Sequence, residues 1–109
     1  MFHVSLGRVR DRVQFKEADE LLVLVVDGDA ARMVRALTEA QKTLNSIKGG
    51  STDEERLQAA RQFAEAIFGK EQAEKLIQFY RNDAICVIEA CGQYFGGGLA
   101  KKITVAQKK

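Results

Sequence analysis

The start of the chain alternates apolar and polar residues, as strands with one buried face do. Phe2, Val4 and Leu6 alternate with polar neighbours, and the phase then changes at Gly7, a residue that tolerates a turn or bulge. Beyond Gly7 the two faces of the next candidate strand differ completely. One face carries Val9, Val13 and Phe15, and the other carries Arg8, Arg10 and Arg12.

Leu21–Val26 is the longest apolar run, six residues between Glu20 and Asp27. Its β-branched side chains favour a buried strand. We therefore predict a small antiparallel meander over residues 1–26. The alternative is that Leu21–Val26 already belongs to the helix that follows.

From residue 27 the apolar period becomes 3.6 residues, which predicts helices. Asp27 or Asp29 can act as the N-cap of the first helix, and Gly49-Gly50 is expected to end it. Its apolar stripe consists of Ala30, Met33, Val34, Leu37, Ala40, Leu44 and Ile47.

A second helix is expected to open at residues 51–55, where two pairs of residues have the spacing of a capping box. The pairs are Ser51 with Glu54 and Thr52 with Glu55. Gly69 is expected to end this helix.

A third, shorter helix and a fourth helix follow. The third carries Ala73, Leu76, Ile77 and Tyr80, and Asn82-Asp83 separates it from the fourth. Gly96–Gly98 predicts a stop or hinge. The remaining tail, Leu99–Lys109, has four lysines and no acidic residue.

These elements predict an α+β, mainly helical fold: a short N-terminal β-meander, about four helices and a basic C-terminal tail. We expect one domain over 1–109, with a β-prone element (1–26), a helical core (27–95) and a glycine hinge with a lysine-rich tail (96–109). Ala84–Phe95 is apolar around most of its circumference. Because such a helix must be covered on all sides, we expect a homo-oligomer.

Composition narrows the classes of protein. The 109 residues are 46% hydrophobic and 29% charged, with a net charge of +2. This composition is too apolar for a disordered chain, and the net charge is too small for a dedicated nucleic-acid binder. No stretch has the length of a membrane span or the pattern of a signal peptide, so we expect a cytoplasmic protein that does not act at a membrane.

Candidate catalytic, metal and cofactor residues do not form recognisable sets. His3 is the only histidine, and Cys86 and Cys91 point apart on a helix, where small buried hydrophobes are the ordinary interpretation. Asp27-Gly28-Asp29 lacks the further oxygen ligands of a calcium loop, and Gly96–Gly98 lacks the spacing of a phosphate loop. We expect no enzyme activity, no cofactor and no metal.

Two basic segments are candidates for partner contact: the arginine row (Arg8, Arg10, Arg12) and the tail, with Lys101 and Lys102 followed by Lys108 and Lys109. Both are equally compatible with a solvated surface. Neither has aromatic residues interleaved, so an acidic or amphipathic protein partner is favoured over nucleic acid. A small nucleic-acid-binding regulator that uses either segment remains the alternative function.

The order of these parts resembles a known family. DGDAARMVRALTEAQKTLNSI is followed by a glycine break, TDEERLQAARQFAEAIFG ends in Phe68-Gly69, and KEQAEKLIQFYRNDAICVIEACGQYF precedes a charged tail. Over residues 27–107 this resembles the small tail assembly chaperones of long-tailed phages and Gram-positive-type prophages.

The resemblance implies a non-catalytic protein of the host cytoplasm that is absent from the finished virion. Such chaperones bind the helical tape measure protein and help recruit tail tube subunits around it. Exposed apolar stripes suit that task, and aromatic side chains dominate contact energies. The residues nominated for partner contact are Phe68, Tyr80, Tyr94 and Phe95; for Phe63 and Ile67, core packing is favoured.

Overall fold

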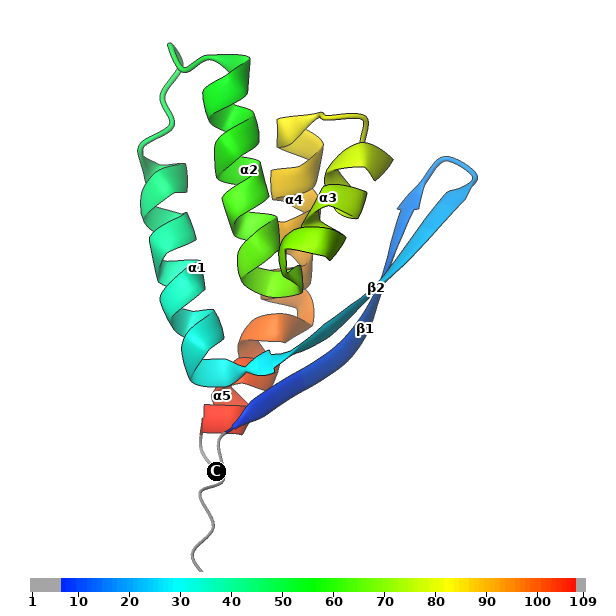
Figure 1. The fold of residues 1–109 in the computed structure, drawn as a ribbon, viewed down its shortest axis with the longest axis vertical. Coiled ribbons are helices and arrows are strands. Elements are labelled where there is room, and N and C mark those ends of the chain that lie inside the picture. The colour runs from blue at the N-terminus through cyan, green and yellow to red at the C-terminus, as the bar shows by residue number, and fades with distance from the viewer. Residues whose placement is uncertain (1–6, 108–109) are drawn as a thin grey trace, which may run out of the picture.

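The structure is a computed structural model and describes residues 7–107. A two-stranded hairpin, β1 (Arg8–Glu17) and β2 (Glu20–Asp29), precedes four helical segments (Figure 1). These segments are α1 (Ala30–Asn45), α2 (Asp53–Phe68), α3 (Lys70–Phe79) and one continuous run formed by α4 (Ala84–Tyr94), η1 (Phe95–Leu99) and α5 (Ala100–Gln107). The chain is 65% helical, so the α+β, mainly helical fold class is confirmed.

The strands pair antiparallel across a two-residue turn, with Val13 opposite Leu24 and Phe15 opposite Leu22. The alternating pattern of β1 is confirmed, because Val9, Val13 and Phe15 are buried while the arginines between them are exposed. Leu21–Val26 lies within β2, so the helical alternative is wrong. The strand expected over 2–6 lies outside the described residues. The part of the predicted meander that the structure describes is a two-stranded hairpin.

Polar side chains begin three helices where the sequence indicates. Asp29 accepts from the Ala31 N–H at 3.0 Å, and Asp83 accepts from the Cys86 N–H at 3.2 Å. Thr52 and Glu55 form the capping box, with distances of 3.0 and 3.1 Å. Hydrogen bonding from Thr52 also lowers the pKa of the Glu55 carboxyl.

The end of α1 departs from the prediction. The helix stops at Asn45, before Gly49-Gly50, because Ser46 closes it. The Ser46 hydroxyl donates to the Thr43 carbonyl at 2.6 Å, and its backbone N–H donates to the Lys42 and Thr43 carbonyls. This side-chain bond satisfies a carbonyl that helix ends otherwise leave without a partner.

The stop or hinge predicted at Gly96–Gly98 is wrong, because the helix continues through these glycines. Gly96–Gly98 lie within η1, a π-helical turn in which the Ala100 N–H donates to the Phe95 carbonyl, and the helix continues to Gln107. Leu99, Ile103 and Ala106 on this helix are buried. Their burial against β1 and α1 stabilises a helical segment that glycine propensity alone disfavours.

The core lies between the hairpin and the helices. In Figure 1, β2 leads into the start of α1, the far end of the hairpin lies on the other side of α2 from α1, and α5 lies beside the start of β1. The largest fully buried side chains are Leu24, Val26, Leu76, Ile77, Val87, Cys91 and Leu99. Within residues 7–107, no helix has the length and apolar character that a membrane crossing requires.

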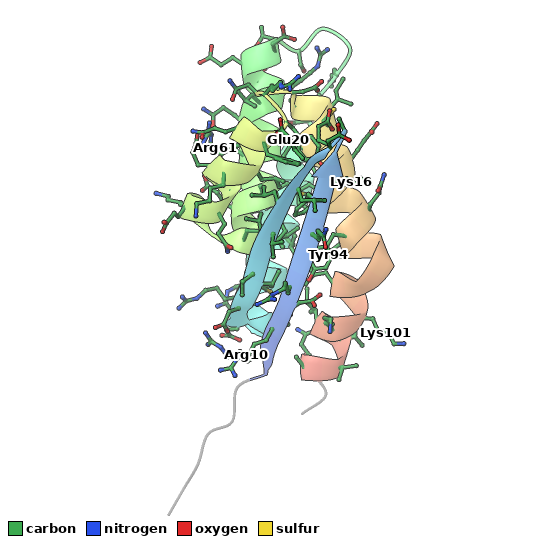
Figure 2. All side chains as sticks on the ribbon, turned by 90° about the vertical axis from the view of Figure 1, so that its right-hand side faces the viewer. Arg10, Lys16, Glu20, Arg61, Tyr94 and Lys101 are labelled. Carbon is green, nitrogen blue, oxygen red and sulfur yellow. The ribbon has the colours of Figure 1, made fainter. Side chains whose placement is uncertain are left out.

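Gln72 of α3 ties the helices to the hairpin. Its amide oxygen accepts from the Val25 N–H at 2.8 Å, and its amide nitrogen donates to the Val25 carbonyl at 2.6 Å and to the Phe68 carbonyl at 2.9 Å. The side chain therefore pairs with the free edge of β2 as a neighbouring strand would. On the same side of the molecule, Arg61 of α2 forms an ion pair with Glu74 of α3 (Figure 2).

Candidate functional site

Three of the four aromatic residues nominated for partner contact form a cluster beneath the hairpin. Phe68 is 6% exposed and lies edge-on to Phe15, with ring centroids 5.7 Å apart. Tyr94 stacks on Phe68 at 6.0 Å, and Tyr80 lies edge-on to Phe15 at 6.5 Å. These aromatic contacts join the strand layer to the helices, so in this structure Phe68 is a core residue.

Tyr94 adds a polar contact to this cluster. Its hydroxyl donates to the Asp11 carboxylate at 2.8 Å, from a half-buried position between α4 and β1 (Figure 2). Burial raises the pKa of the Tyr94 phenol above its ordinary value, and the nearby Asp11 carboxylate raises it further. Burial likewise raises the pKa of Tyr80.

Phe95, the fourth nominated aromatic residue, lies at a groove and is 37% exposed. The groove runs between α1 and the η1–α5 helix and has a volume of about 480 Å³; we call it the α1–α5 groove. Phe63 of α2, 9% exposed, also lines it. Its other apolar lining residues are Val34, Leu37, Leu44, Ala100 and Ile103.

Most polar side chains that line the α1–α5 groove have partners within the chain. The Thr38 hydroxyl donates to the Val34 carbonyl at 2.8 Å, and the Thr104 hydroxyl donates to the Ala100 carbonyl at 2.9 Å. The Gln41 amide donates to the Asn45 side chain at 2.9 Å. Because these groups are already bonded within their own helices, the groove offers an occupant chiefly apolar contact.

The cysteines are unpaired thiols within helix α4, as expected. Cys91 is fully buried and Cys86 is half-buried. Burial raises the pKa of the Cys91 thiol to about 12, and burial also raises that of Cys86. A thiol with such a pKa is almost entirely protonated near neutral pH, which makes it a poor nucleophile.

In the part of the chain that the structure describes, acidic and cysteine side chains do not gather into a metal-binding set. Over residues 7–107, no three of them lie close enough to hold an ion. Asp27-Gly28-Asp29 ends β2, where Asp29 is the α1 N-cap and Asp27 faces two arginines. His3 lies outside the described residues.

Parts of the two basic segments lie at one depression, whereas Lys108 and Lys109 lie outside the described residues. Arg8 and Arg10 of β1 and Lys101 and Lys102 of α5 line one depression of about 490 Å³. The Asp27 carboxylate partly balances the positive charge there, since it lies 2.6 Å from the Arg8 guanidinium and 3.5 Å from that of Arg10. The hydrogen bond from Arg8 is the main reason that the pKa of the Asp27 carboxyl is lowered. Arg12 is exposed on the same strand but is not among the lining residues.

The hairpin also exposes an apolar row that the sequence analysis missed. Leu21, Val23 and Val25 are 57%, 50% and 48% exposed, although Leu21–Val26 was expected to be a buried strand. In a two-stranded sheet covered on one face, alternate residues point outward. Leu24 and Val26 point inward and are buried, so Leu21, Val23 and Val25, which alternate with them along the strand, point outward.

Comparisons with protein-family models, with curated proteins and with solved structures found no match for this chain.

Proposed function

We propose that this protein is a non-catalytic assembly chaperone that holds an amphipathic helix of another polypeptide in the α1–α5 groove. The observation that carries the proposal is the groove itself: an apolar trough between two helices with Phe63 and Phe95 in its lining. An amphipathic helix that lays its apolar face into such a trough removes both surfaces from water. The polar lining residues, largely satisfied within their own helices, leave little specific chemistry for a small substrate.

The resemblance to phage tail assembly chaperones supplies the partner in this proposal. The groove binds the tape measure protein in the host cytoplasm, and the protein then helps recruit tail tube subunits and leaves before the virion is complete. Self-association belongs to the same proposal, since the sequence of Ala84–Phe95 is apolar around most of the helix circumference. Light scattering of the purified chain tests that part, because more than one oligomeric species is expected.

Co-expression with a tape measure protein that is insoluble alone tests the proposal. The wild-type chain is expected to bring the tape measure protein into the soluble fraction. Phe95→Glu and Thr38→Glu place a charge in the groove at exposed positions, so each is expected to abolish this rescue. Val105→Glu is the matched control, because Val105 is 52% exposed on α5 and does not line the groove.

Circular dichroism of the purified variants separates lost binding from lost folding. If both groove variants remain folded and still rescue the tape measure protein as well as Val105→Glu does, the groove is not the binding site. If wild type gives no rescue at all, the assignment of this partner fails.

The convergence of Arg8, Arg10, Lys101 and Lys102 favours a second candidate, a small nucleic-acid-binding regulator. Binding through phosphates releases counterions, so it weakens steeply with salt. A gel shift at low salt that disappears in Lys101→Glu/Lys102→Glu would support this function. Absence of any shift at low salt would remove it.

A further inference from the structure

We propose that the outer face of the hairpin docks a second kind of partner, an acidic amphipathic helix from another polypeptide. This hairpin outer face consists of the apolar row Leu21, Val23 and Val25 and the cations Arg12 and Lys16. It is separate from the α1–α5 groove, and the inference stands without the function proposed above.

The strand register sets the two kinds of residue side by side. Arg12 lies opposite Val25 and Lys16 lies opposite Leu21, with Val23 between them facing Gln14. Neighbouring strands lie about 4.8 Å apart, so an apolar row and a cationic row run in parallel at that spacing. Figure 2 shows the two strands side by side, with Lys16 and Arg10 near opposite ends of β1.

The charge of this face lacks a counterpart within the described chain. Asp27 takes both Arg8 and Arg10 as ion-pair partners at the base of the hairpin. Arg12 and Lys16 have no ion pair with any of residues 7–107. A partner that covers the apolar row would also bring these two cations toward its own surface, and carboxylates there would complement them.

The hairpin of a second copy, packed symmetrically on this face, does not supply those carboxylates. Two copies packed face to face about a two-fold axis across the strands would lay β1 on β1, so that cations oppose cations. A two-fold axis along the strands would lay each cationic row on the apolar row of the other copy, with no opposite charge. The hairpin of a second copy therefore does not complement this face, and the occupant we propose is a different polypeptide.

Addition of a strand to the β2 edge is blocked where the apolar row ends. The Val25 N–H and carbonyl, which a new strand would need, are both hydrogen-bonded to Gln72. Docking on the face leaves these bonds intact. A helix is about 10 Å across, wide enough to cover both rows at once.

The geometry also specifies the helix. Lys16 is four residues from Arg12, roughly 13 Å along a strand, which corresponds to two to three turns of a helix. The occupant thus has an apolar stripe flanked on one side by acidic residues two to three turns apart. Such a helix places its stripe on Leu21, Val23 and Val25 and its carboxylates over β1.

A synthetic helical peptide tests this site. The probe has about 18 residues, with a leucine stripe and glutamates along one flank; a second peptide replaces those glutamates with lysine. Fluorescence anisotropy is expected to show that the full-length protein binds the acidic peptide, more weakly at high salt, and does not bind the lysine peptide.

Variants locate the binding. Val23→Glu and the double variant Arg12→Glu/Lys16→Glu are each expected to weaken binding of the acidic peptide at least about tenfold. Ile85→Glu is the matched control, an equally charged change at an exposed apolar side chain on α4, and it is expected to leave affinity unchanged. Circular dichroism confirms that each variant is folded, and Phe95→Glu in the α1–α5 groove is also expected to bind the peptide normally.

Four results would overturn the inference. The first is no binding of the acidic peptide by wild type, and the second is equal weakening by Ile85→Glu. The third is binding of duplex DNA or phosphatidylglycerol vesicles that the hairpin variants abolish while the acidic peptide does not bind. The fourth is a concentration-dependent dimer in sedimentation that Val23→Glu dissociates, which would make a second copy the occupant.

Discussion

At the scale of single residues, Tyr94 links β1 to α4 by one hydrogen bond to Asp11. We expect Tyr94→Phe to lower the free energy of unfolding by about 1–2 kcal/mol, since it removes one bond to a charged acceptor and keeps the ring stacked on Phe68. Urea unfolding of wild type and variant measures the difference. An unchanged stability would mean that water replaces this bond without loss.

Burial of the Cys91 thiol makes stability depend on alkaline pH. Its pKa is about 12 in the folded chain and about 8.5 in an unfolded one, so the folded state retains a proton that the unfolded state loses. The stabilisation is complete below about pH 8 and disappears as pH rises from 9 toward 12. Urea unfolding is expected to show a decline of at most about 1.4 kcal/mol per pH unit from this group. Cys91→Ala should flatten the decline, and an equal slope in that variant would contradict the assignment.

The hairpin turn holds a residue in an unfavourable conformation. Ala18 has a φ of 53°, in the left-handed region that costs an L-residue about 1–2 kcal/mol. Ala18→Gly is expected to raise the thermal midpoint, by a net gain of about 0.5–1 kcal/mol. The neighbouring Asp19 does not have a positive φ, so Asp19→Gly should give no such gain.

At the scale of elements, substitution of a glycine in η1 tests whether this segment is a hinge or part of a continuous helix. Nothing lies within 4 Å of a Cβ added at Gly97, so Gly97→Ala should stabilise a helical segment by about 0.5–1 kcal/mol. Gly69→Ala is the matched substitution of opposite sign, because Gly69 has a φ of +83° between α2 and α3. Thermal unfolding compares the two. A destabilising Gly97→Ala would contradict a continuous helix from α4 to α5.

The sequence of η1 predicts a hinge although the segment is helical. Three consecutive glycines have low helix propensity, and the prediction of a hinge follows from that local preference. The helix persists because Leu99 and Ile103 are buried against residues far away in the sequence. By contrast, the caps at Asp29, Thr52 and Asp83 could be predicted, since each bonds an N–H two or three residues ahead.

At the scale of the whole molecule, the two ends of the described chain lie against each other. A Cβ added at Gly7 would lie 2.2 Å from the Ala106 carbonyl oxygen, and the Gly7 carbonyl accepts from the Ala30 N–H at 2.8 Å. Gly7→Ala is therefore expected to lower the free energy of unfolding by about 1–3 kcal/mol. Denaturant unfolding measures it, and a neutral effect would show that α5 does not pack against the start of β1 as the structure has it.

The two proposed docking surfaces also belong to this scale. The α1–α5 groove is formed by helices from opposite ends of the sequence, whereas the hairpin outer face lies on the other side of α2 (Figure 1). The two surfaces have no residue in common, so substitutions at one are expected to leave binding at the other unchanged. A chain with both surfaces could hold two helical partners at once.

The sequence by itself determined the class of most elements from β1 to α4, the strand faces of β1 and the helix caps. These depend on alternation, on 3.6-residue periodicity and on hydrogen bonds between near neighbours, all of which act over a few residues. Only the tertiary structure decided that Phe68 is a core residue while Phe95 is exposed at a groove, that Leu21, Val23 and Val25 face outward, and that the glycine segment is helical. Local pattern says which face of an element is apolar, but which apolar face is covered depends on the packing of segments distant in the chain, because burial is a property of the assembled layers.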